Sequence, residues 1–380
     1  MKQNKKIILI GTAASSVLGF RANLIKALLE QQHSVYAFVS EYTQAELHKI
    51  ESLGVIPITY QLKRGGLNPL ADIKVTYGLS KKIKEIAPDL VFSYFSKPVI
   101  FGTLAAKLVK VPKIIGMLEG LGYAFTDQPE GLSKKTKLIK SLQVLLYKIA
   151  LPQLDKLIFL NPDDPIDLLD KYNIKVNRVE IIGGIGLDLE DYTYQPLINV
   201  ERSVKFIFVG RLLKEKGIHD FIAAAQIVKK KYPQTQFTVL GAIDASNLGA
   251  LKKVELDKLI SLQIVNYPGQ VDNVKEWLVH SDVFVLPSYR EGVPLSTQEA
   301  MAIGRAVITT DVPGCRETVV NGVNGFLVDK WNPQALAEKM TYFIENPEQV
   351  GIMGYESRKM AQKKFDATEV NKRLLAILDV

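Results

Sequence analysis

Short apolar runs alternate with longer amphipathic stretches along the whole chain. In the first half, runs rich in β-branched and aromatic residues predict strands over Lys6–Ile10, Ser34–Val39, Val55–Tyr60, Leu90–Tyr94, Lys113–Met117 and Lys156–Leu160. Apolar residues at helical spacing predict helices over Asn23–Glu30 and Ile73–Ile86. We expect a further helix to begin at Ser96-Lys97-Pro98, with Ser96 as its N-cap and proline in its first turn.

The second half repeats this alternation. Strands are predicted over Val204–Val209, Gln236–Leu240, Ile264–Tyr267, Val283–Leu286, Ala306–Thr309 and Gly325–Val328. Helices are predicted over Asp220–Lys231, Val274–His280, Ser296–Ile303, Pro333–Asn346 and Ala367–Leu378. Because short strands alternate with helices, we expect an α/β protein whose parallel sheets carry helices on both faces.

Two such units in one chain predict two facing Rossmann-like domains. The polar segment Asp188–Asn199 has no sustained period and favours a boundary near residues 185–202. We therefore expect a first domain over 1–188, a second over 200–362, and a terminal helix within 363–380 that packs back on the first domain. Ligands of open α/β sheets bind at the carboxyl ends of strands, so facing domains would enclose an interdomain cleft suited to two substrates.

Composition narrows the class of protein. At roughly 150 residues per domain, 380 residues correspond to about two domains. Hydrophobic residues make up 47% and charged residues 23%, which excludes a disordered chain. No apolar run reaches the roughly 18 residues that a membrane-spanning helix needs. The single cysteine, Cys315, excludes an intramolecular disulfide and fits a reducing compartment such as the cytoplasm.

The positive charge is concentrated in the first half. Of the formal net charge of +8, residues 1–190 carry +7 and residues 191–380 carry +1, which indicates an anionic partner for the first half. Within Gly131–Leu154, lysines and apolar residues follow helical spacing at Lys134, Lys135, Lys137, Leu138, Lys140, Leu142, Leu145, Lys148 and Ile149. A basic amphipathic helix of this kind suits an anionic membrane surface. The alternative is a solvated lysine face over an apolar stripe packed on the domain core.

Candidate chemistry follows two strands of the second half. The stretch Pro287–Met301 carries Glu291 in a loop and Glu299 in the first turn of the helix expected after it. The N–H groups of Leu295 and Ser296 lie at the helix start, where an anion is favoured. Ser296-x-x-Glu299 is also a capping-box pattern, so a bond from Glu299 back to the Ser296 amide is an alternative.

The second stretch is Phe208–Gly217, which leaves one strand and enters the next helix. Arg211 and Lys216 are expected at the carboxyl edge of the sheet. Two cations there suit a diphosphate, because arginine binds it as a bidentate fork and lysine as a point charge. The alternative is that Lys214 and Lys216 are solvated turn residues.

In order and spacing, these stretches resemble the retaining glycosyltransferases of the family-4 type, which have the GT-B fold. Gly-Arg-Leu at 210–212 and Glu-Lys-Gly at 215–217 are followed by the pair Glu291-x7-Glu299 and by Glu-Ala-Met-Ala at 299–302. Residues 307–317 and 321–328 continue the resemblance, which extends over essentially the whole chain.

The resemblance implies three catalytic residues. Arg211 and Lys216 would hold the donor diphosphate and offset the charge on the departing nucleotide. Glu291 would face the donor sugar and touch its hydroxyls or the developing oxocarbenium-like centre. No cofactor is implied, since the UDP-sugar is a substrate. With no Asp-x-Asp motif and no His/Cys cluster in the sequence, no metal is expected.

The resemblance also implies donor-binding residues. Glu299 would accept hydrogen bonds from the ribose hydroxyls, and the amides of Leu295 and Ser296 would bind the phosphates. The backbone of Val271 would pair with the edge of the base. Gly19 would let the N-terminal loop approach the diphosphate, because no Cβ intervenes.

Two motifs of the first half narrow the subgroup. Residues 96–107 and 120–126 resemble the branch acting on polyprenyl-diphosphate-linked sugars, which includes N-acetylgalactosaminyltransferases of bacterial glycan assembly. The chain departs from the family in one loop: many relatives carry a histidine after the strand equivalent to Lys113–Met117, and here Glu119 and Gly120 stand there. Glu119 is either a substitute polar contact with sugar or acceptor, or an ordinary loop carboxylate.

The sequence thus predicts a peripheral enzyme on the cytoplasmic face of the membrane. It would move a hexose or N-acetylhexosamine from a UDP-sugar to a polyprenyl-diphosphate-linked sugar with retention. One alternative is a nucleotide-sugar epimerase or sugar phosphorylase on the same fold, and another is a non-catalytic sugar- or membrane-binding protein. Nucleic acid is not an expected partner, because no nucleic-acid-binding motif is present.

Overall fold

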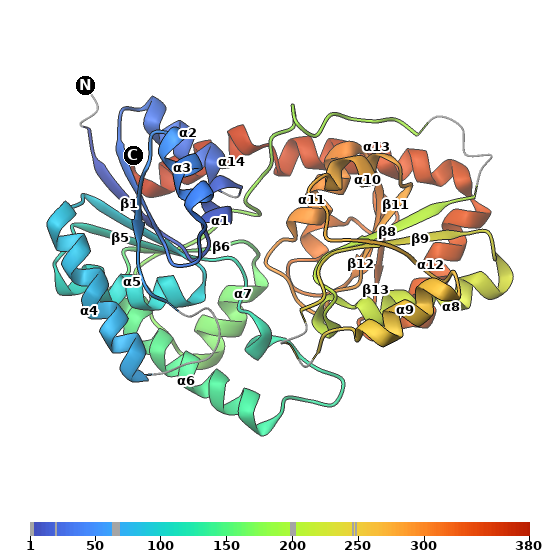
Figure 1. Ribbon diagram of the computed structural model, residues 1–380, viewed down its shortest axis with the longest axis horizontal. Coiled ribbons are helices and arrows are strands. Elements are labelled where there is room, and N and C mark those ends of the chain that lie inside the picture. The colour runs from blue at the N-terminus through green and yellow to red at the C-terminus, as the bar shows by residue number, and fades with distance from the viewer. Residues whose placement is uncertain (1–3, 20, 63–68, 198–202, 245–246, 248) are drawn as a thin grey trace. The chain divides into compact units, whose positions relative to one another are not determined.

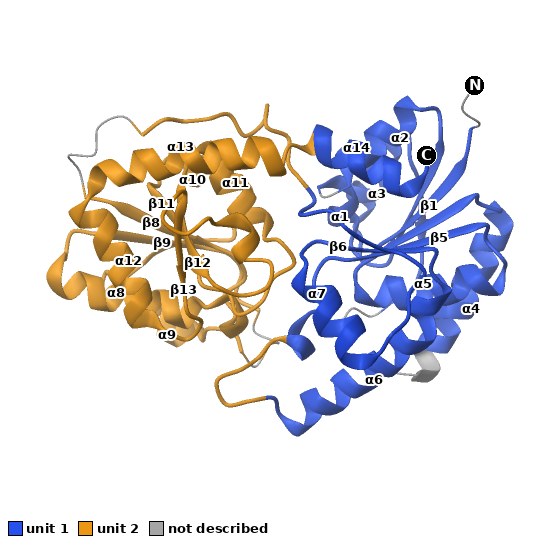
Figure 2. Ribbon diagram, turned by 180° about the vertical axis from the view of Figure 1, so that it is seen from behind, with its two compact units in different colours: residues 1–125, 132–185, 368–380 blue, residues 126–131, 186–367 orange. Residues whose placement is uncertain are grey.

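The computed structural model describes residues 4–19, 21–62, 69–197, 203–244, 247 and 249–380. The chain divides into two compact units, shown in blue and orange in Figure 2. Unit 1 comprises residues 1–125, 132–185 and 368–380, and unit 2 comprises residues 126–131 and 186–367. Residue 200, where the sequence predicts the second domain to begin, lies outside the described residues.

Unit 1 is built on a parallel sheet whose described strands number seven, in the order β3-β2-β1-β4-β5-β6-β7. The strands are β1 (Lys6–Ile10), β2 (Ser34–Val39), β3 (Ile56–Thr59), β4 (Leu90–Tyr94), β5 (Lys113–Leu118), β6 (Lys156–Phe159) and β7 (Val179–Ile181). β1, β2 and β4 have the predicted bounds. β7 was not predicted, because its three residues are too few to show alternation.

Helices cover both faces of the sheet of unit 1, with α4, α5 and α6 on one face and α2 and α3 on the other (Figure 1). The helices are α1 (Ala14–Leu18), α2 (Ala22–Glu30), α3 (Gln44–Ser52), α4 (Pro69–Ile86), α5 (Ser96–Leu108), α6 (Lys134–Ala150), α7 (Asp163–Pro165) and α14 (Ala367–Leu378). The predicted cap of α5 is wrong: Phe95, at φ 70°, is the N-cap, and Ser96 is the first helical residue.

The chain end returns to unit 1 through α14. Lys156 Nζ donates to the Ile377 carbonyl oxygen at 2.6 Å and pairs with the Asp379 carboxylate at 3.0 Å. Lys113 pairs with the same carboxylate, and Lys5 Nζ donates to the Asp379 carbonyl oxygen at 2.7 Å. Three lysines, from the N-terminal end of β1 and from β5 and β6, thus hold the last turn of the chain.

Unit 2 repeats the architecture with a sheet of six described strands, in the order β10-β9-β8-β11-β12-β13, all parallel. The strands are β8 (Lys205–Val209), β9 (Gln236–Leu240), β10 (Asn266–Gly269), β11 (Val283–Leu286), β12 (Ala306–Thr310) and β13 (Gly325–Val328). The helices are α8 (Ile218–Lys231), α9 (Lys253–Ser261), α10 (Val274–Val279), α11 (Leu295–Ile303), α12 (Pro333–Glu345) and α13 (Pro347–Lys364). The predicted doubly wound α/β fold is confirmed for both units.

A short segment inside the range predicted for the first domain belongs to unit 2. Residues Thr126–Gly131 group with that unit. Two ion pairs hold them there: Lys214 with Glu130 at 2.6 Å, and Lys330 with Asp127 at 2.9 Å.

Candidate active site

The strand order of unit 2 reverses between β8 and β11. In sequence, β9 and β10 continue on one side of β8, whereas β12 and β13 continue on the other side of β11. The two strands are parallel neighbours, with Val283 opposite Phe206, so the chain leaves both at the same edge of the sheet. Open α/β sheets bind ligands at such a reversal. The two predicted site stretches, Phe208–Gly217 and Pro287–Met301, leave β8 and β11 at this edge.

Gly217 brings these two stretches into contact. The 3₁₀ turn η4 (Lys214–Lys216) ends at Gly217, whose φ of 74° is left-handed. A Cβ at this position would lie 2.0 Å from the carbonyl oxygen of Pro287. The Tyr289 amide also donates to the Glu215 carbonyl oxygen at 2.9 Å. Glycine is therefore required where the lysine turn crosses the loop that carries Glu291.

Gly217→Ala tests this crossing. The added methyl group clashes with the Pro287 backbone and forces a left-handed φ on alanine, so we expect about 2–4 kcal/mol of destabilisation, visible as a lower thermal midpoint. Gly78→Ala is the matched control, because its Cβ would meet nothing within 4 Å on α4, and it should be neutral or stabilising by up to about 1 kcal/mol. Equal midpoints for Gly217→Ala and the wild type would contradict the crossing.

Lys216 and Glu291 form an ion pair at this edge. Lys216 Nζ donates to Glu291 Oε1 at 2.5 Å, and Ser288 Oγ donates to the same oxygen at 2.8 Å. The two charged side chains are only 22% and 11% exposed. Lys214 pairs with Glu130 instead. The alternative of a solvated turn residue is therefore wrong for Lys216, whereas Lys214 pairs with a carboxylate that is itself 70% exposed.

Arg211 and the first turn of α11 lie at the end of β8. The Arg211 side chain is exposed and makes no ion pair with the described residues. Ser296 Oγ donates to the Val209 carbonyl oxygen at 3.1 Å, which holds the helix against the strand end. α11 begins at Leu295, after Pro294 as N-cap. The N–H groups of Leu295 and Ser296 thus precede the first helical hydrogen bond, an arrangement that favours an anion.

Glu299 lies in the second turn of α11, not in the predicted first turn. Its Oε1 accepts a hydrogen bond from the Tyr192 hydroxyl at 2.8 Å. No side chain caps the helix, so the capping-box alternative is wrong. Burial raises the pKa of Glu299 to about 7, and the hydrogen bond from Tyr192 acts in the opposite direction.

Tyr192 is a site residue that sequence reasoning missed. It lies in the aperiodic segment after Gly186, where only a tyrosine in a polar stretch could have drawn attention. Arg358 Nη1 donates to the Tyr192 carbonyl oxygen at 2.7 Å, and Arg305 Nη1 donates to the Gln195 carbonyl oxygen at 2.9 Å. Two arginines thus hold the segment beside α11, and Tyr192 is a positioning residue for Glu299.

If Glu299 binds the ribose of a nucleotide, as the family resemblance implies, Tyr192→Phe should change the pH dependence of that binding. Glu299 accepts hydrogen bonds best when ionised, so affinity should fall as the pH falls through its pKa. Removing the Tyr192 hydroxyl removes an interaction that lowers this pKa, so the fall should move to higher pH. We expect roughly fivefold weaker UDP binding near pH 6.5, from about 1 kcal/mol, and recovery near pH 8.5. Calorimetric titration across this range measures it, and an unshifted profile would contradict the role of Tyr192.

Val271 lies two residues after β10. Gly269 ends the strand at a φ of 95°, and its carbonyl oxygen accepts from the Gly241 amide at 3.0 Å. The N–H and carbonyl of Val271 make no hydrogen bond to the described residues. Both groups are therefore open to a ligand, and pairing with a base edge stays a prediction.

The strand order of unit 1 reverses between β1 and β4, and Gly19 is the C-cap of α1, the short helix that follows β1. Gly19 is exposed and has a negative φ of −95°. A Cβ there would meet only the Ser15 carbonyl oxygen, at 3.2 Å. The local backbone therefore does not require glycine, and close approach to a diphosphate stays the predicted reason for it.

Glu119 forms a buried ion pair with Arg21 at the same end of unit 1. The side chains are 10% and 2% exposed. The Arg21 guanidinium lies 4.5 Å from the centre of the Tyr94 ring, and burial lowers the pKa of Arg21 to about 10. Glu119 is thus not an ordinary solvated loop carboxylate. Its contact with a sugar or an acceptor stays a prediction.

The basic helix α6 turns much of its predicted apolar stripe outward. Leu138, Leu145 and Ile149 are 71%, 53% and 51% exposed, whereas the buried apolar residues of the helix are Val144, Tyr147 and Ala150. The alternative of a stripe packed on the domain core is therefore wrong.

None of the helices in the described part of the chain is long and apolar enough to cross a membrane. Nor do the described His, Cys, Asp and Glu side chains form a group of three or more that could hold a metal ion.

Comparison with known protein families gives a match for each of the two units. Residues 6–161 match the family described as glycosyl transferase 4-like, and residues 195–360 match the glycosyl transferases group 1. The chain is thus a member of the family-4-type glycosyltransferases with the GT-B fold, and family and fold support glycosyltransferase activity.

Two curated relatives show which enzymes of this family the chain is similar to. The chain is 28% identical, over 98% of both chains, to the N,N'-diacetylbacillosaminyl-diphospho-undecaprenol alpha-1,3-N-acetylgalactosaminyltransferase of Campylobacter jejuni. It is 27% identical to the UDP-Gal:alpha-D-GlcNAc-diphosphoundecaprenol alpha-1,3-galactosyltransferase of Escherichia coli, over 68% of this chain and 67% of the relative. Among solved structures, Anabaena HepE bound to UDP and glucose matches with a TM-score of 0.78 at 17% identity, over 99% of this chain and 100% of that chain.

Proposed function

We propose that this protein transfers a hexose or N-acetylhexosamine from a UDP-sugar to a polyprenyl-diphosphate-linked sugar, with retention of configuration, in bacterial glycan assembly. The observation that carries the proposal is the Lys216–Glu291 pair beside the free amides of α11 at the strand reversal of unit 2. The names of the Campylobacter and Escherichia relatives support the acceptor class.

The charged groups at this edge suit the breaking of a sugar–diphosphate bond. Arg211, Lys216 and the amides of Leu295 and Ser296 bind the diphosphate and stabilise the negative charge that develops on the departing UDP. Such cations do the work that a divalent metal does in other phosphate sites. Glu291 faces the donor sugar, and Glu299 accepts hydrogen bonds from the ribose hydroxyls.

Retention is proposed to follow attack from the face that UDP leaves. Lys216 and Ser288 both donate to Glu291 Oε1, which favours a carboxylate that orients the sugar over one that attacks it. The acceptor hydroxyl then forms the new bond to the anomeric carbon as the bond to the diphosphate breaks. Its proton passes to the departing diphosphate oxygen, so the enzyme needs no separate base.

A nucleotide-sugar screen by thermal shift tests donor binding. A ligand that binds only the folded state raises the midpoint according to its concentration over its dissociation constant. We expect UDP-sugars to raise the midpoint, and Lys216→Ala to lose most of the response. A response only to nucleotide sugars of another base would overturn the assignment of UDP.

The acceptor requires access to a membrane leaflet, so we propose peripheral association with the cytoplasmic face through α6. The exposed Leu138, Leu145 and Ile149 accompany a lysine-rich first turn, a combination suited to an anionic interface. Lys140 differs from the other lysines of this helix because it makes a cation–π contact: its Nζ lies 4.7 Å from the centre of the Phe125 ring.

Neutralising Lys134, Lys135, Lys137 and Lys140 tests this surface. At about 1 kcal/mol for each lysine near an anionic leaflet, replacement of all four by glutamine should abolish cosedimentation with phosphatidylglycerol vesicles. Binding should also weaken with added salt in the wild type. As a control, Lys252, Lys253 and Lys275 of unit 2 changed to glutamine should leave vesicle binding intact. Unchanged binding of the α6 variant would refute the role of this helix.

A further inference from the structure

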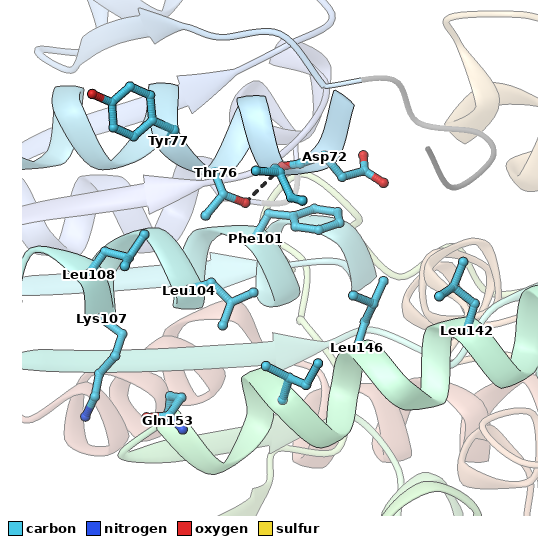
Figure 3. A pocket seen from close by; sticks show the side chains of 12 residues that line it. Asp72, Thr76, Tyr77, Phe101, Leu104, Lys107, Leu108, Leu142, Leu146 and Gln153 are labelled. Atoms are coloured by element: carbon cyan, nitrogen blue, oxygen red, sulfur yellow. Dashed lines mark hydrogen bonds between the residues drawn. The ribbon is translucent and has the colours of Figure 1, made fainter. Parts of the chain in front are cut away.

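An apolar groove lies between α4, α5 and α6 of unit 1. Its volume is about 620 Å³, within the roughly 300–1,000 Å³ typical of small-molecule sites. Figure 3 shows Phe101, Leu104, Leu142 and Leu146 around it, from α5 and α6. The proposed donor site in unit 2 uses none of these residues.

The groove is open, and large apolar side chains on its rim are exposed. Ile73, Tyr77, Leu108 and Ile149 are 67%, 60%, 66% and 51% exposed, and all four line it. Exposed apolar side chains gathered at one place on a protein of this size mark a binding surface. The hydroxyl of Thr76, which lines the groove, donates to the Asp72 carbonyl oxygen in the same helix at 2.9 Å. Its hydrogen is therefore used within α4 and does not need a partner in the groove.

Charged groups lie at the ends of the groove and not along it. α5 begins directly after β4, at the strand reversal of unit 1, and its first turn carries Lys97, which interacts electrostatically with the groove residue Asp72. Lys107 lies toward the other end of α5. From Phe101 to Leu108 the groove follows α5 for about 10 Å, at 1.5 Å per residue.

We propose that this groove binds the first isoprene units of the acceptor's polyprenyl chain, with the diphosphate toward Lys97. A polyprenyl diphosphate has an anionic head and a long apolar tail. The apolar groove matches the tail, and Lys97, which interacts with Asp72, is the cation at the strand-edge end of α5 that the diphosphate would meet. The rest of the chain continues over the exposed rim toward the leaflet. This inference rests on the proposed acceptor class, and it adds the site that binds the lipid part of the acceptor.

Binding of farnesyl diphosphate tests the groove without catalysis. In the wild type, farnesyl diphosphate should raise the thermal midpoint more than inorganic diphosphate does. Leu104→Gln places a polar group in the groove and should remove the difference. Ile149→Gln, at an exposed rim position, should reduce it and guards against misfolding of the first variant. Ile352→Gln is the matched control, because Ile352 is a similarly exposed isoleucine (54%) on helix α13 of unit 2.

Acceptor kinetics test the groove in the working enzyme. With one diphosphate-linked sugar on a farnesyl or a methyl group, kcat/KM of the wild type should be larger for the farnesyl acceptor. Leu104→Gln should lower this preference roughly tenfold through KM, since each buried methylene group contributes substantially to binding, and Ile352→Gln should keep it.

Three results would contradict the assignment of the groove to the polyprenyl chain. They are an equal response of the wild type to farnesyl and inorganic diphosphate, an unchanged preference in Leu104→Gln, and an equal loss in Leu138→Gln. Leu138 lies on α6 outside the groove, so an equal loss there would assign the lipid to the general surface of that helix. If farnesyl diphosphate binds as expected but no acceptor receives sugar, the proposed function fails and the groove stands.

Discussion

Lys216→Ala should lower kcat for sugar transfer by about 10²–10³-fold while the protein stays folded, the effect typical of removing one preorganised donor to a developing anion. Lys216 is a partly buried cation at the proposed donor edge, and its Nζ lies 2.5 Å from Glu291 Oε1. Its loss removes charge from the diphosphate and also leaves Glu291 without its ionic partner. We therefore expect a larger fall in kcat than in substrate affinity.

Lys214→Ala provides the control within the same turn. Lys214 is two residues away and pairs with the exposed Glu130, an interaction that contributes little because it is exposed to solvent. We expect near wild-type kcat, with circular dichroism and thermal midpoint showing that both variants fold. If Lys214→Ala and Lys216→Ala lose activity alike, the turn matters as a structure and not through the Lys216 charge. Full activity of Lys216→Ala would remove it from the catalytic residues.

Glu299→Ala should lower kcat/KM for the UDP-sugar by roughly 100-fold, mainly through KM. Two hydrogen bonds from ribose hydroxyls to a carboxylate contribute about 1.5–3 kcal/mol each. The loss should appear equally in the dissociation constant of UDP, measured by titration calorimetry. Glu348→Ala, at an exposed position on α13, is the control and should bind UDP as the wild type does.

A double-mutant cycle links this prediction to Tyr192. If Tyr192 acts through Glu299, the change Tyr192→Phe should have no further effect on UDP binding in the Glu299→Ala background. Additive losses would mean that Tyr192 contributes on its own. Wild-type UDP affinity of Glu299→Ala would contradict the ribose assignment altogether.

Much of the fold is readable from the sequence, because buried parallel strands are short apolar runs. β1, β2, β4, β9, β11 and β13 fall on their predicted residues. The helices α1, α3, α7, α9 and α13 were not predicted. α3 buries only Ile50, and α13 is largely polar, so the apolar periodicity that marks a helix is weak in both. β10 is shifted toward Gly269, where the register with β9 is irregular.

The site is partly readable for the same physical reason. Strand ends of a parallel sheet share one edge, so Arg211, Lys216, Glu291 and the start of α11 could be assigned to it from order alone. The pairing of Lys216 with Glu291 depends on the contact between Gly217 and Pro287, which no local pattern records. Tyr192 reaches Glu299 from a segment without periodicity. The Ser296-x-x-Glu299 pattern failed because the helix begins at Leu295, two residues earlier than a cap at Ser296 requires.

The uneven charge of the chain also has a structural counterpart. Lysines of the first half gather on α6 beside exposed leucines, whereas the proposed donor edge of unit 2 uses few cations. Both features are consistent with the proposed lipid-linked acceptor at an anionic leaflet.

Product analysis of one complete reaction tests the central claim most directly. A UDP-sugar and a farnesyl-diphosphate-linked N-acetylhexosamine are incubated with the wild type, and the products are identified by mass spectrometry and proton NMR. We predict free UDP and one new glycosidic bond that has the anomeric configuration of the donor. An epimerised nucleotide sugar, a sugar phosphate, or an inverted glycosidic bond would contradict the account.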